Sequence, residues 1–549
     1  MAIEPQPVTA GRRMKLVVTA AAAGTVFEWY DFFIYGSLAP IIAKHFFAAA
    51  DPTQGYILTL LTFAAGFFAR PFGAVIFGRL GDRTGRKRTF LITISVMGLA
   101  TFLAGLLPDA NVIGPAAPWL LVALRMGQGF AIGGEYGGAA IYVAEHALGH
   151  RRGSATGWIQ LSASIGLLLA LGAILIVQSA IGTEAFSHWG WRIPFLLSVI
   201  LLGISLWIRL KLEESPLFQR IREEGGLAKA PLREALLDPR SLKRILIVLF
   251  GILTGQGVVW YLAQFYTLFY LEHVLKLDLA HSTFLIMAMT AITLPFYVLF
   301  ASVSDRIGRK PLMLAGLLTI AIATFPIFHM LTEAVNPALA RAAQHAPVVV
   351  TAAPADCSLQ LNLTGTAKYA SSCDIAKAAL TNAGIPYRNS VTGAGGLARV
   401  HVGGTALLSP DGRKLSALAL AVAKKDFAGR LAAALRLAGY PDAADPAVVS
   451  YGRALLLLIV LGFAAAALYA PQAAALVELF PTRIRYTALS VPYHVGVGWF
   501  GGFLPAIAFA IVAATGNIYA GLWYPVIVAV AGFLLAMLML PETYRVDIE

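Results

Sequence analysis

The sequence predicts an all-α integral membrane protein, with twelve transmembrane helices in two six-helix halves. A small α/β insert outside the membrane is predicted between helices nine and ten. Three observations support this fold class. The composition is too apolar for a soluble chain, twelve apolar stretches are long enough to cross a bilayer, and one polar motif occurs at the same place in each half.

The composition excludes most other classes of protein. Of the 549 residues, 58% are hydrophobic and 13% are charged, whereas about 25% of a typical soluble domain is charged. The mean hydropathy is +0.73. A soluble enzyme, a disordered chain and a secreted disulfide scaffold are therefore excluded. The sequence has no nucleotide-binding loop, nucleophile elbow or metal-ligand cluster, so we expect no enzymatic activity and no metal.

The twelve predicted spans follow from apolar runs of roughly 20 residues, the length that a membrane helix requires. Strands of a β-barrel are excluded because they would be short and alternating. The spans are predicted at 16–38, 56–78, 89–107, 119–144, 155–178, 190–210, 245–270, 282–303, 311–331, 452–475, 487–512 and 519–540.

The distribution of basic residues predicts the orientation. The net charge is +13, and basic residues collect in the cytoplasmic loops of membrane proteins. The short loops predicted outside contain only Lys44 and Lys276, whereas the N-terminus and the loops on the other side are basic. Both termini are therefore predicted in the cytoplasm. A nucleic-acid partner is not expected, because no basic segment carries a nucleic-acid-binding motif.

A polar, charged loop in the middle of the chain divides the spans six and six. The predicted organisation is an N-terminal six-helix bundle (1–210), a central cytoplasmic loop (211–244), helices seven to nine (245–331), an extracytoplasmic insert (332–451) and helices ten to twelve (452–549).

An internal repeat supports this division. Asp-Arg-x-Gly-Arg-Lys occurs after span two, from Asp82, and after span eight, from Asp305. Spans four and ten each end in a glutamate followed by basic residues. We expect these charges to close the cytoplasmic side and to separate as the halves rock; simple positive-inside loops are the alternative. The candidate gate residues are Asp82, Arg86, Glu145, Arg152, Asp305, Arg309, Glu478 and Arg483.

Three strings then narrow the interpretation. They are Gly-Thr-Val-Phe-Glu-Trp-Tyr-Asp-Phe-Phe-Ile-Tyr-Gly from Gly24, Arg-Met-Gly-Gln-Gly-Phe-Ala-Ile-Gly-Gly-Glu-Tyr-Gly-Gly from Arg125, and Glu-Ser-Pro-Leu-Phe from Glu214. With the repeated motif, they resemble the metabolite:proton symporter family of the major facilitator superfamily. That family includes transporters of α-ketoglutarate, citrate, shikimate and proline or betaine. The resemblance covers the chain except the insert, with one departure: Ala301 stands where the first motif has Gly78.

Carboxylates inside the spans are the candidates for proton coupling, because ionisable residues in a membrane are costly and usually functional. Glu28 and Asp31 are three residues apart, close to one helical face. Two carboxylates so close resist being ionised together, which is one way to build a proton site. The proton-coupling candidates are Asp31, Glu135 and Glu28; a role for Glu28 at a helix end stays open.

Two arginines inside the spans are the main substrate candidates. Arg70 and Arg125 would bind a carboxylate through two parallel hydrogen bonds and stay charged. A static buried salt bridge, Arg125 with Asp31 or Arg70 with Glu135, is the alternative. Substrate binding and a buried salt bridge are compatible if the arginine exchanges its carboxylate partner when a proton or the substrate binds.

The C-terminal half has fewer charges in its spans. Gln256, Trp260 and Gln264 are spaced four residues apart and share one face of span seven. With Tyr30 and His494 they complete the substrate-binding candidates. An interfacial aromatic belt and a packing role for the histidine are the alternatives.

The insert has the composition of a small folded domain. Helices are predicted at Cys373–Ala383 and Lys414–Leu437, and strands at Ala398–Val402 and Thr405–Leu408. Both cysteines of the chain, Cys357 and Cys373, lie here, which predicts one disulfide in an oxidising compartment. A structural cap, substrate capture and partner docking all stay open for its role.

The combined hypothesis is a proton-coupled symporter of a small hydrophilic metabolite, most simply a carboxylate, in the cytoplasmic (inner) membrane. The proton is the coupling ion and no other cofactor is expected. The partners are the metabolite, the proton and the lipid bilayer, and the oligomeric state is left open. The alternatives are a proline or betaine symporter, a proton-antiport exporter and a transporter-like receptor that uses the insert.

Overall fold

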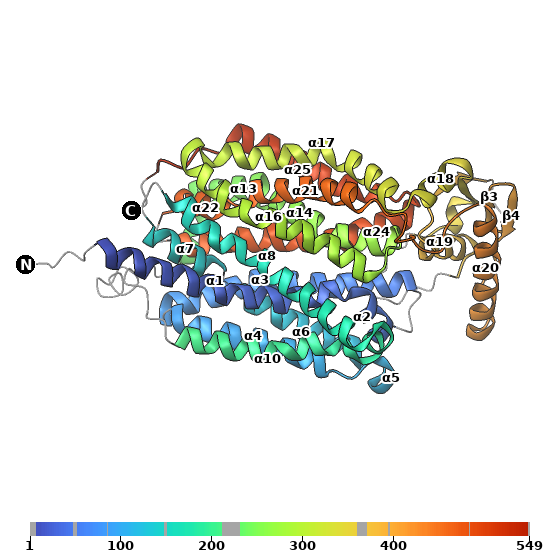
Figure 1. Ribbon diagram of the computed structural model, residues 1–549, viewed down its shortest axis with the longest axis horizontal. Helices are drawn as coiled ribbons and strands as arrows, with labels where there is room; N and C mark the ends of the chain where they lie inside the picture. The colour runs from blue at the N-terminus through green and yellow to red at the C-terminus, as the bar shows by residue number, and fades with distance from the viewer. Residues whose placement is uncertain are drawn as a thin grey trace, which may run out of the picture.

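The computed structural model describes residues 7–47, 52–84, 86–134, 136–147, 151–210, 231–358, 370–392, 396–481 and 484–546. Long helices run side by side along one axis and form an elongated body (Figure 1). Helix α1 begins and helix α25 ends at one end of this body, called the termini end below, and a mixed α/β unit lies at the other. The predicted predominantly helical architecture is therefore present.

The N-terminal half is entirely helical within its described residues. Its elements are α1 (Pro7–Ser37), α2 (Ala39–Phe46), α3 (Pro52–Thr84), α4 (Arg86–Leu106), α5 (Ala110–Ile113), α6 (Ala116–Ile132), α7 (Tyr136–His146), α8 (Arg152–Ile181), α9 (Thr183–Ala185), the π-helical turn η2 (Phe186–Gly190) and α10 (Arg192–Leu210).

The C-terminal half contains several π-helical turns, which insert an extra residue into a helix and often lie at functional sites. Its elements are α12 (Pro231–Leu237), α13 (Pro239–Val248), η3 (Leu249–Leu253), α14 (Thr254–Tyr261), η4 (Leu262–Tyr266), α15 (Thr267–Phe269), η5 (Tyr270–Val274), α16 (Leu279–Ile307), α17 (Arg309–Val335), α21 (Tyr451–Tyr469), α22 (Gln472–Leu479), α23 (Arg485–Tyr493), η7 (His494–Gly501), α24 (Leu504–Thr515), η8 (Ala520–Leu522) and α25 (Trp523–Met539).

Eight helical segments within the described ranges are long and apolar enough to cross a membrane. A ninth candidate is bent: Thr183–Gly190 and Arg192–Trp207 meet at 63°. The helix Leu91–Leu106 is apolar but shorter. Predicted span six, at 190–210, therefore corresponds to α10, and a separate helical segment that the apolar pattern does not reveal precedes it at a sharp bend.

The outside of the helical body is apolar, and charged side chains are inside it. Ile176, Ile322 and Leu538 are more than two-thirds exposed, whereas Arg70 and Arg125 are fully buried. A soluble protein shows the opposite arrangement. The described surface therefore suits a lipid environment, in which charged groups must face one another or a cavity.

The α/β unit follows α17 and precedes α21. Its elements are α18 (Pro337–His345), β1 (Val348–Ala352), the 3₁₀ turn η6 (Pro354–Asp356), α19 (Ser372–Asn382), β2 (Tyr387–Val391), β3 (Arg399–Val402), β4 (Thr405–Leu408) and α20 (Ala417–Leu437). The strand order is β2-β1-β3-β4, with β1 parallel to β2 and the other pairs antiparallel. Cys357 and Cys373 form a disulfide between the segment after β1 and the first turn of α19.

This unit is attached to the helical body by hydrogen bonds. The Tyr387 hydroxyl donates to the Ala513 carbonyl at 3.0 Å, and the Ala444 amide donates to the Lys276 carbonyl at 3.1 Å. Helix α19 also contacts α24 of the C-terminal half and α3 of the N-terminal half. The insert therefore touches both halves at the end opposite the termini (Figure 1).

Candidate transport site

Arg70 lies on α3 and is fully buried. Its guanidinium carbon is 4.1 Å from the centre of the Phe67 ring and 4.4 Å from that of Phe32. Within the described part of the chain, none of its three guanidinium nitrogens has a hydrogen-bond partner of standard geometry. Aromatic faces stabilise the positive charge, but they leave the donors available to a ligand.

Several polar side chains near Arg70 belong to the C-terminal half. Tyr261, Tyr469, Tyr493 and His494 lie close enough to Arg70 to act on it electrostatically. Tyr469 and Tyr493 are themselves joined, hydroxyl to hydroxyl, at 3.3 Å. Arg70 of the N-terminal half thus faces a neutral polar wall built by α14, α21, α23 and η7.

Arg125 lies on α6 and is also fully buried. Its guanidinium donates to the Gln128 side-chain oxygen and, at 3.4 Å, to the Phe32 carbonyl. Nε and Nη2 have no hydrogen-bond partner among the residues that the structure describes. Arg125 and Arg70 are close enough for their charges to repel, and an anion between them would relieve that repulsion.

Glycine packing holds α3 and α6 together at this place. A Cβ on Gly129 would lie 1.6 Å from the Gly66 carbonyl oxygen, so no other residue fits there without moving a helix. Pro71, directly after Arg70, removes the backbone donor that would otherwise bond to the Phe67 carbonyl. The span-four glycines therefore have a packing role that positions both arginines.

Asp31 is connected to Arg125 through two neutral residues. The Gln128 amide donates to the Thr101 hydroxyl at 2.7 Å, and this hydroxyl also interacts with the Asp31 carboxyl group. Asp31 Oδ1 is buried and has no hydrogen-bond partner in the described structure. No direct ion pair between Arg125 and Asp31 is present among the described residues, so the static salt bridge considered above is replaced by a chain of hydrogen bonds.

The other candidates on span one and span four have different positions. Glu28 is buried and interacts electrostatically with Asp31. The Tyr30 hydroxyl donates to the Pro194 carbonyl at 2.9 Å, so it is engaged by α10 rather than by the arginines. Glu135 lies outside the described residues, and with it the alternative pair Arg70–Glu135.

The predicted residues of span seven are all buried but are not equivalent. The Gln264 side-chain oxygen accepts a hydrogen bond from Thr290 at 2.9 Å, within the C-terminal half. The Gln256 side-chain oxygen has no partner among the described groups. The Trp260 ring stacks on Phe33 of α1 with centroids 5.1 Å apart, so it packs one half against the other.

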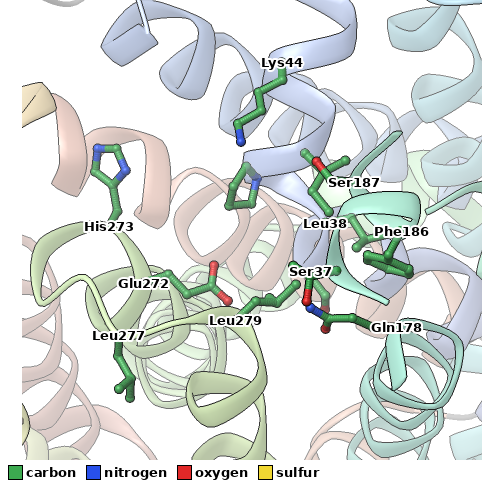
Figure 2. A pocket seen from close by; sticks show the side chains of 13 residues that line it. Ser37, Leu38, Lys44, Gln178, Phe186, Ser187, Glu272, His273, Leu277 and Leu279 are labelled. Carbon is green, nitrogen blue, oxygen red and sulfur yellow. The ribbon is translucent and has the colours of Figure 1, made fainter. Parts of the chain in front are cut away.

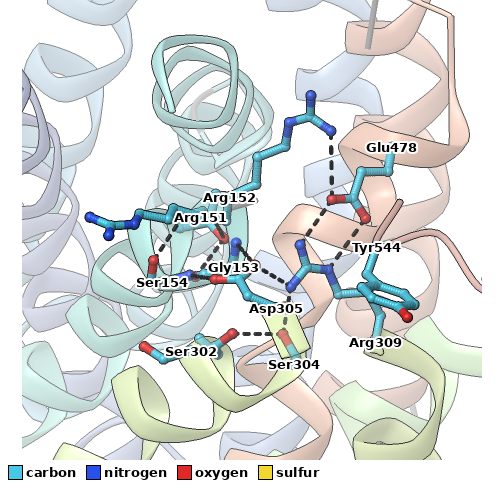
Figure 3. A network of polar contacts seen from close by, with 12 residues as sticks. Arg151, Arg152, Gly153, Ser154, Ser302, Ser304, Asp305, Arg309, Glu478 and Tyr544 are labelled. Carbon is cyan, nitrogen blue, oxygen red and sulfur yellow. Dashed lines mark hydrogen bonds and ion pairs between the residues drawn. The ribbon is translucent and has the colours of Figure 1, made fainter. Parts of the chain in front are cut away.

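The two ends of the interface between the halves differ. At the insert end, a cavity of about 270 Å³ separates α1, α2, α8 and η2 from η5 and the start of α16 (Figure 2). At the end near the termini, charged residues join the halves (Figure 3). The conformation is therefore closed at the termini end and hollowed at the insert end.

A network around Arg309 closes the termini end. Arg309 contacts Asp305 at 2.6 Å and Glu478 at 3.0 Å, and Arg152 of the N-terminal half lies 3.9 Å from Glu478 (Figure 3). The Asp305 carboxylate accepts hydrogen bonds from the Gly153 and Ser154 amides, both at 2.8 Å. Asp305 thereby caps the N-terminus of a helix of the opposite half.

A second ion pair crosses the interface beside this network. Arg485 Nη1 lies 3.1 Å from Glu145 Oε1, and both side chains are buried. Arg483, predicted for this role, lies outside the described residues. The side chains of Asp82 and Arg86 also lie outside them, although both residues fall within helices α3 and α4.

The backbone conformation explains why the second copy of the repeated motif contains a glycine, Gly308. Gly308 has φ +105°, a conformation that favours glycine. A Cβ at Gly308 would lie 2.4 Å from Glu542, whose carboxylate accepts from the Arg309 amide at 2.8 Å. Sequence reasoning overlooked Glu542; its signal was an acidic residue two positions after the predicted end of the last span.

Comparison with known proteins agrees with this architecture. Residues 16–244 match the family model described as "Sugar (and other) transporter". The proline/betaine transporter of Escherichia coli K12 is 35% identical over 327 residues, which are 58% of this chain and 65% of the transporter. The chain thus spans slightly less than two-thirds of that relative.

Another relative is covered more fully. The shikimate transporter of Escherichia coli K12 is 38% identical over 322 residues, 58% of this chain and 72% of that protein. Among solved structures, the crystal structure of a D-xylose-proton symporter superimposes with a TM-score of 0.60 at 16% identity, over 97% of this chain and 99% of that one. The chain therefore belongs to the metabolite transporters of the major facilitator superfamily.

Proposed function

We propose that this protein is a secondary active transporter that carries a small hydrophilic carboxylate metabolite together with protons across the cytoplasmic (inner) membrane. Twelve spans, cytoplasmic termini and an insert outside the cell complete the proposal. Support for this topology comes from the positions of the start of α1 and the end of α25 at one end of the body and of the insert at the other (Figure 1). The basic cytoplasmic loops that the sequence predicts also support it.

The observation that carries the proposal is the pair of buried arginines. Arg70 and Arg125 are fully buried, and five of their six guanidinium nitrogens have no hydrogen-bond partner of standard geometry in the described structure. Unpartnered buried donors are costly. A substrate carboxylate would pair with them bidentately and remove that cost. Substrate binding is thus favoured where both halves contribute groups, as alternating access requires.

The coupling device is the chain Asp31–Thr101–Gln128–Arg125. Protonation of Asp31 would weaken its carboxyl group as an acceptor for the Thr101 hydroxyl and add a donor. The Thr101 hydroxyl, which accepts from the Gln128 amide, would then change how it holds Gln128. The Gln128 amide in turn sets which Arg125 donors are free for the substrate. Proton and substrate would therefore bind cooperatively without a direct Arg–Asp ion pair.

A zwitterionic osmolyte is the second candidate substrate. Relatives include proteins named for proline and betaine, and both molecules carry the carboxylate that the arginines would bind. Both candidates carry a carboxylate that the arginines would bind. They differ in the cationic group, which the zwitterion has and a simple carboxylate metabolite lacks.

The test is uptake by the purified full-length protein in proteoliposomes. An inward proton gradient should drive accumulation of radiolabelled shikimate or glycine betaine above equilibrium, and collapsing the gradient should abolish it. Accumulation that ignores the gradient would refute proton coupling. Accumulation of glycine betaine without shikimate would select the osmolyte alternative.

A further inference from the structure

The cavity at the insert end contains charged residues that the proposed transport site does not use. Its walls include Ser37, Lys44 and Gln178 from the N-terminal half, and Glu272 and His273 from the C-terminal half. Figure 2 shows the Glu272 carboxylate and the Lys44 ammonium group turned toward the space between these walls. Residues of opposite charge, Lys44 and Glu272, therefore line the same cavity from different halves.

Glu272 is the most unusual group in this cavity. Both of its carboxylate oxygens are buried, and neither has a hydrogen-bond partner among the described residues. Asp278 adds a like charge nearby and is itself occupied, because it caps α16 and pairs with His281 at 2.6 Å. A buried carboxylate in this setting is stabilised by a cation.

The opposite wall offers complementary groups. Lys44 is on α2 and exposed to the cavity. The Gln178 side-chain oxygen on α8 is buried and has no hydrogen-bond partner in the described chain. No ion pair joins Lys44 to Glu272 among the residues described, so neither group neutralises the charge of the other.

We propose that this cavity is an outer binding site for a small zwitterion, with its cationic group at Glu272 and its carboxylate toward Lys44. Gln178 supplies a further polar contact. The volume of about 270 Å³ is just below the 300–1,000 Å³ typical of small-molecule sites, which suits a compact metabolite. This inference rests on the proposed function in one respect: the proposed topology makes the cavity open to the outside of the cell.

The outer cavity lies between the two halves, so we infer that it takes part in the entry of the ligand toward the central site. Glu272 and Lys44 belong to different halves, so rocking of the halves changes their separation. Gly384 of the insert packs against the His273 carbonyl and the Lys276 side chain, which places the insert beside the cavity. A ligand held here would wait outside the aromatic layer formed by Phe33, Trp260 and Phe265.

The test uses thiol protection. Both cysteines of the chain are joined in a disulfide, so Ser187→Cys, on the cavity wall, adds a single free thiol. We measure its rate of labelling by a membrane-impermeant maleimide in the full-length protein. Glycine betaine should slow labelling at least threefold, and shikimate, which has no cationic group, should not.

Further substitutions in the Ser187→Cys background assign the protection to this cavity. Glu272→Gln and Lys44→Gln should each reduce protection by glycine betaine, and Glu272→Asp should restore part of it. Glu333→Gln is the matched control, because Glu333 is an exposed glutamate that pairs with Arg453, and protection should persist. Protection that survives both Glu272→Gln and Lys44→Gln would overturn the proposal.

Arg125→Ala separates this site from the central one. If glycine betaine protects Ser187→Cys only by binding at the arginines and closing the protein, Arg125→Ala abolishes protection, and the outer site is refuted. Protection that persists in Arg125→Ala supports it. If proton-driven uptake is absent but glycine betaine still protects the thiol in a way that depends on Glu272, the proposed function is refuted. The outer binding site would still be supported.

Discussion

The Asp305 carboxylate, near the end of α16 in the C-terminal half, accepts a hydrogen bond from the Gly153 amide in the first turn of α8 in the N-terminal half, at 2.8 Å. A helix N-terminus attracts negative charge, so this contact stabilises the closed termini end. The hydrogen bond exists only while the two halves are in contact at the termini end. The cap therefore belongs to one conformation, unlike a cap within one half.

Asp305→Asn should weaken this closure. The amide group cannot accept from both the Gly153 and Ser154 amides, and it loses the ion pair with Arg309. Loss of a helix cap costs about 0.5–2 kcal/mol, which would shift the two-state population by roughly 2- to 30-fold. Labelling of Ser187→Cys should slow, because the cavity at the insert end would be open less often.

Asp238→Asn is the matched control for that variant. Asp238 caps α13 by accepting from the Ser241 amide at 2.9 Å, entirely within the C-terminal half. Its loss should leave the Ser187→Cys labelling rate unchanged. Equal effects of both variants would mean that Asp305 acts on general stability rather than on closure.

The pair Glu145–Arg485 predicts a charge-swap rescue. Both side chains are buried at 3.1 Å, and removing one partner leaves an uncompensated charge, a cost of about 3–5 kcal/mol. Glu145→Arg and Arg485→Glu should each reduce uptake and the melting temperature, whereas the double variant should recover part of both. An additive loss in the double variant would contradict a direct coupling.

Arg70 and Arg125 should not tolerate lysine. Lysine keeps the positive charge but cannot form two parallel hydrogen bonds with a carboxylate. Loss of one hydrogen bond to a charged group costs about 1.5–3 kcal/mol, equivalent to at least about tenfold in affinity. Arg125→Lys and Arg70→Lys should therefore raise the KM of uptake by that factor. Arg192→Lys is the control, since Arg192 donates to the Gly105 and Leu107 carbonyls within one half; an equal KM change there would argue against a substrate role.

Asp31→Asn and Thr101→Val should uncouple transport. Both break the chain between the proton site and Arg125, so gradient-driven accumulation should fall while substrate exchange across the vesicle membrane continues. Thr59→Val provides the control, because the Thr59 hydroxyl donates only to the Gly55 carbonyl of its own helix. Normal accumulation in Thr101→Val would show that the relay is not used.

The disulfide should stabilise the insert rather than the transport site. Cys357 and Cys373 are 16 residues apart, and closing a loop of this length contributes about 3 kcal/mol in the chain-entropy model. Cys357→Ser with Cys373→Ser should make the insert sensitive to limited proteolysis, with uptake retained at low temperature. Unchanged proteolysis would mean that packing of α19 alone holds the insert.

Local signals predicted much of the insert. Strand β4 has the predicted bounds, Thr405–Leu408, and α19 begins one residue before the predicted helix. Strands β1 and β2 were not predicted, because their parallel pairing depends on partners that lie about 35–40 residues apart in the chain. Turn residues indicate where strands end, but parallel pairing has no short-range turn signature.

The central site was predicted through its charges and missed in its neutral groups. Buried arginines are conspicuous in an apolar span, whereas Gln128, Thr101 and the three tyrosines facing Arg70 resemble ordinary polar residues. Glu272 was overlooked because it lies at the end of a span, where charged residues are common. Only the structure shows that its oxygens are buried without a partner among the described residues.

The sequence by itself determined the membrane class and the set of costly charges inside the spans, and it predicted the two-half organisation and the insert with its two cysteines. These follow from composition and repeats, which are local properties of the chain. The tertiary structure decided which charges meet: Asp305 with the amides of α8, Glu145 with Arg485, and Asp31 with Arg125 through Thr101 and Gln128. Partners up to 340 residues apart are brought together by helix packing, and spacing along the sequence carries no record of that packing.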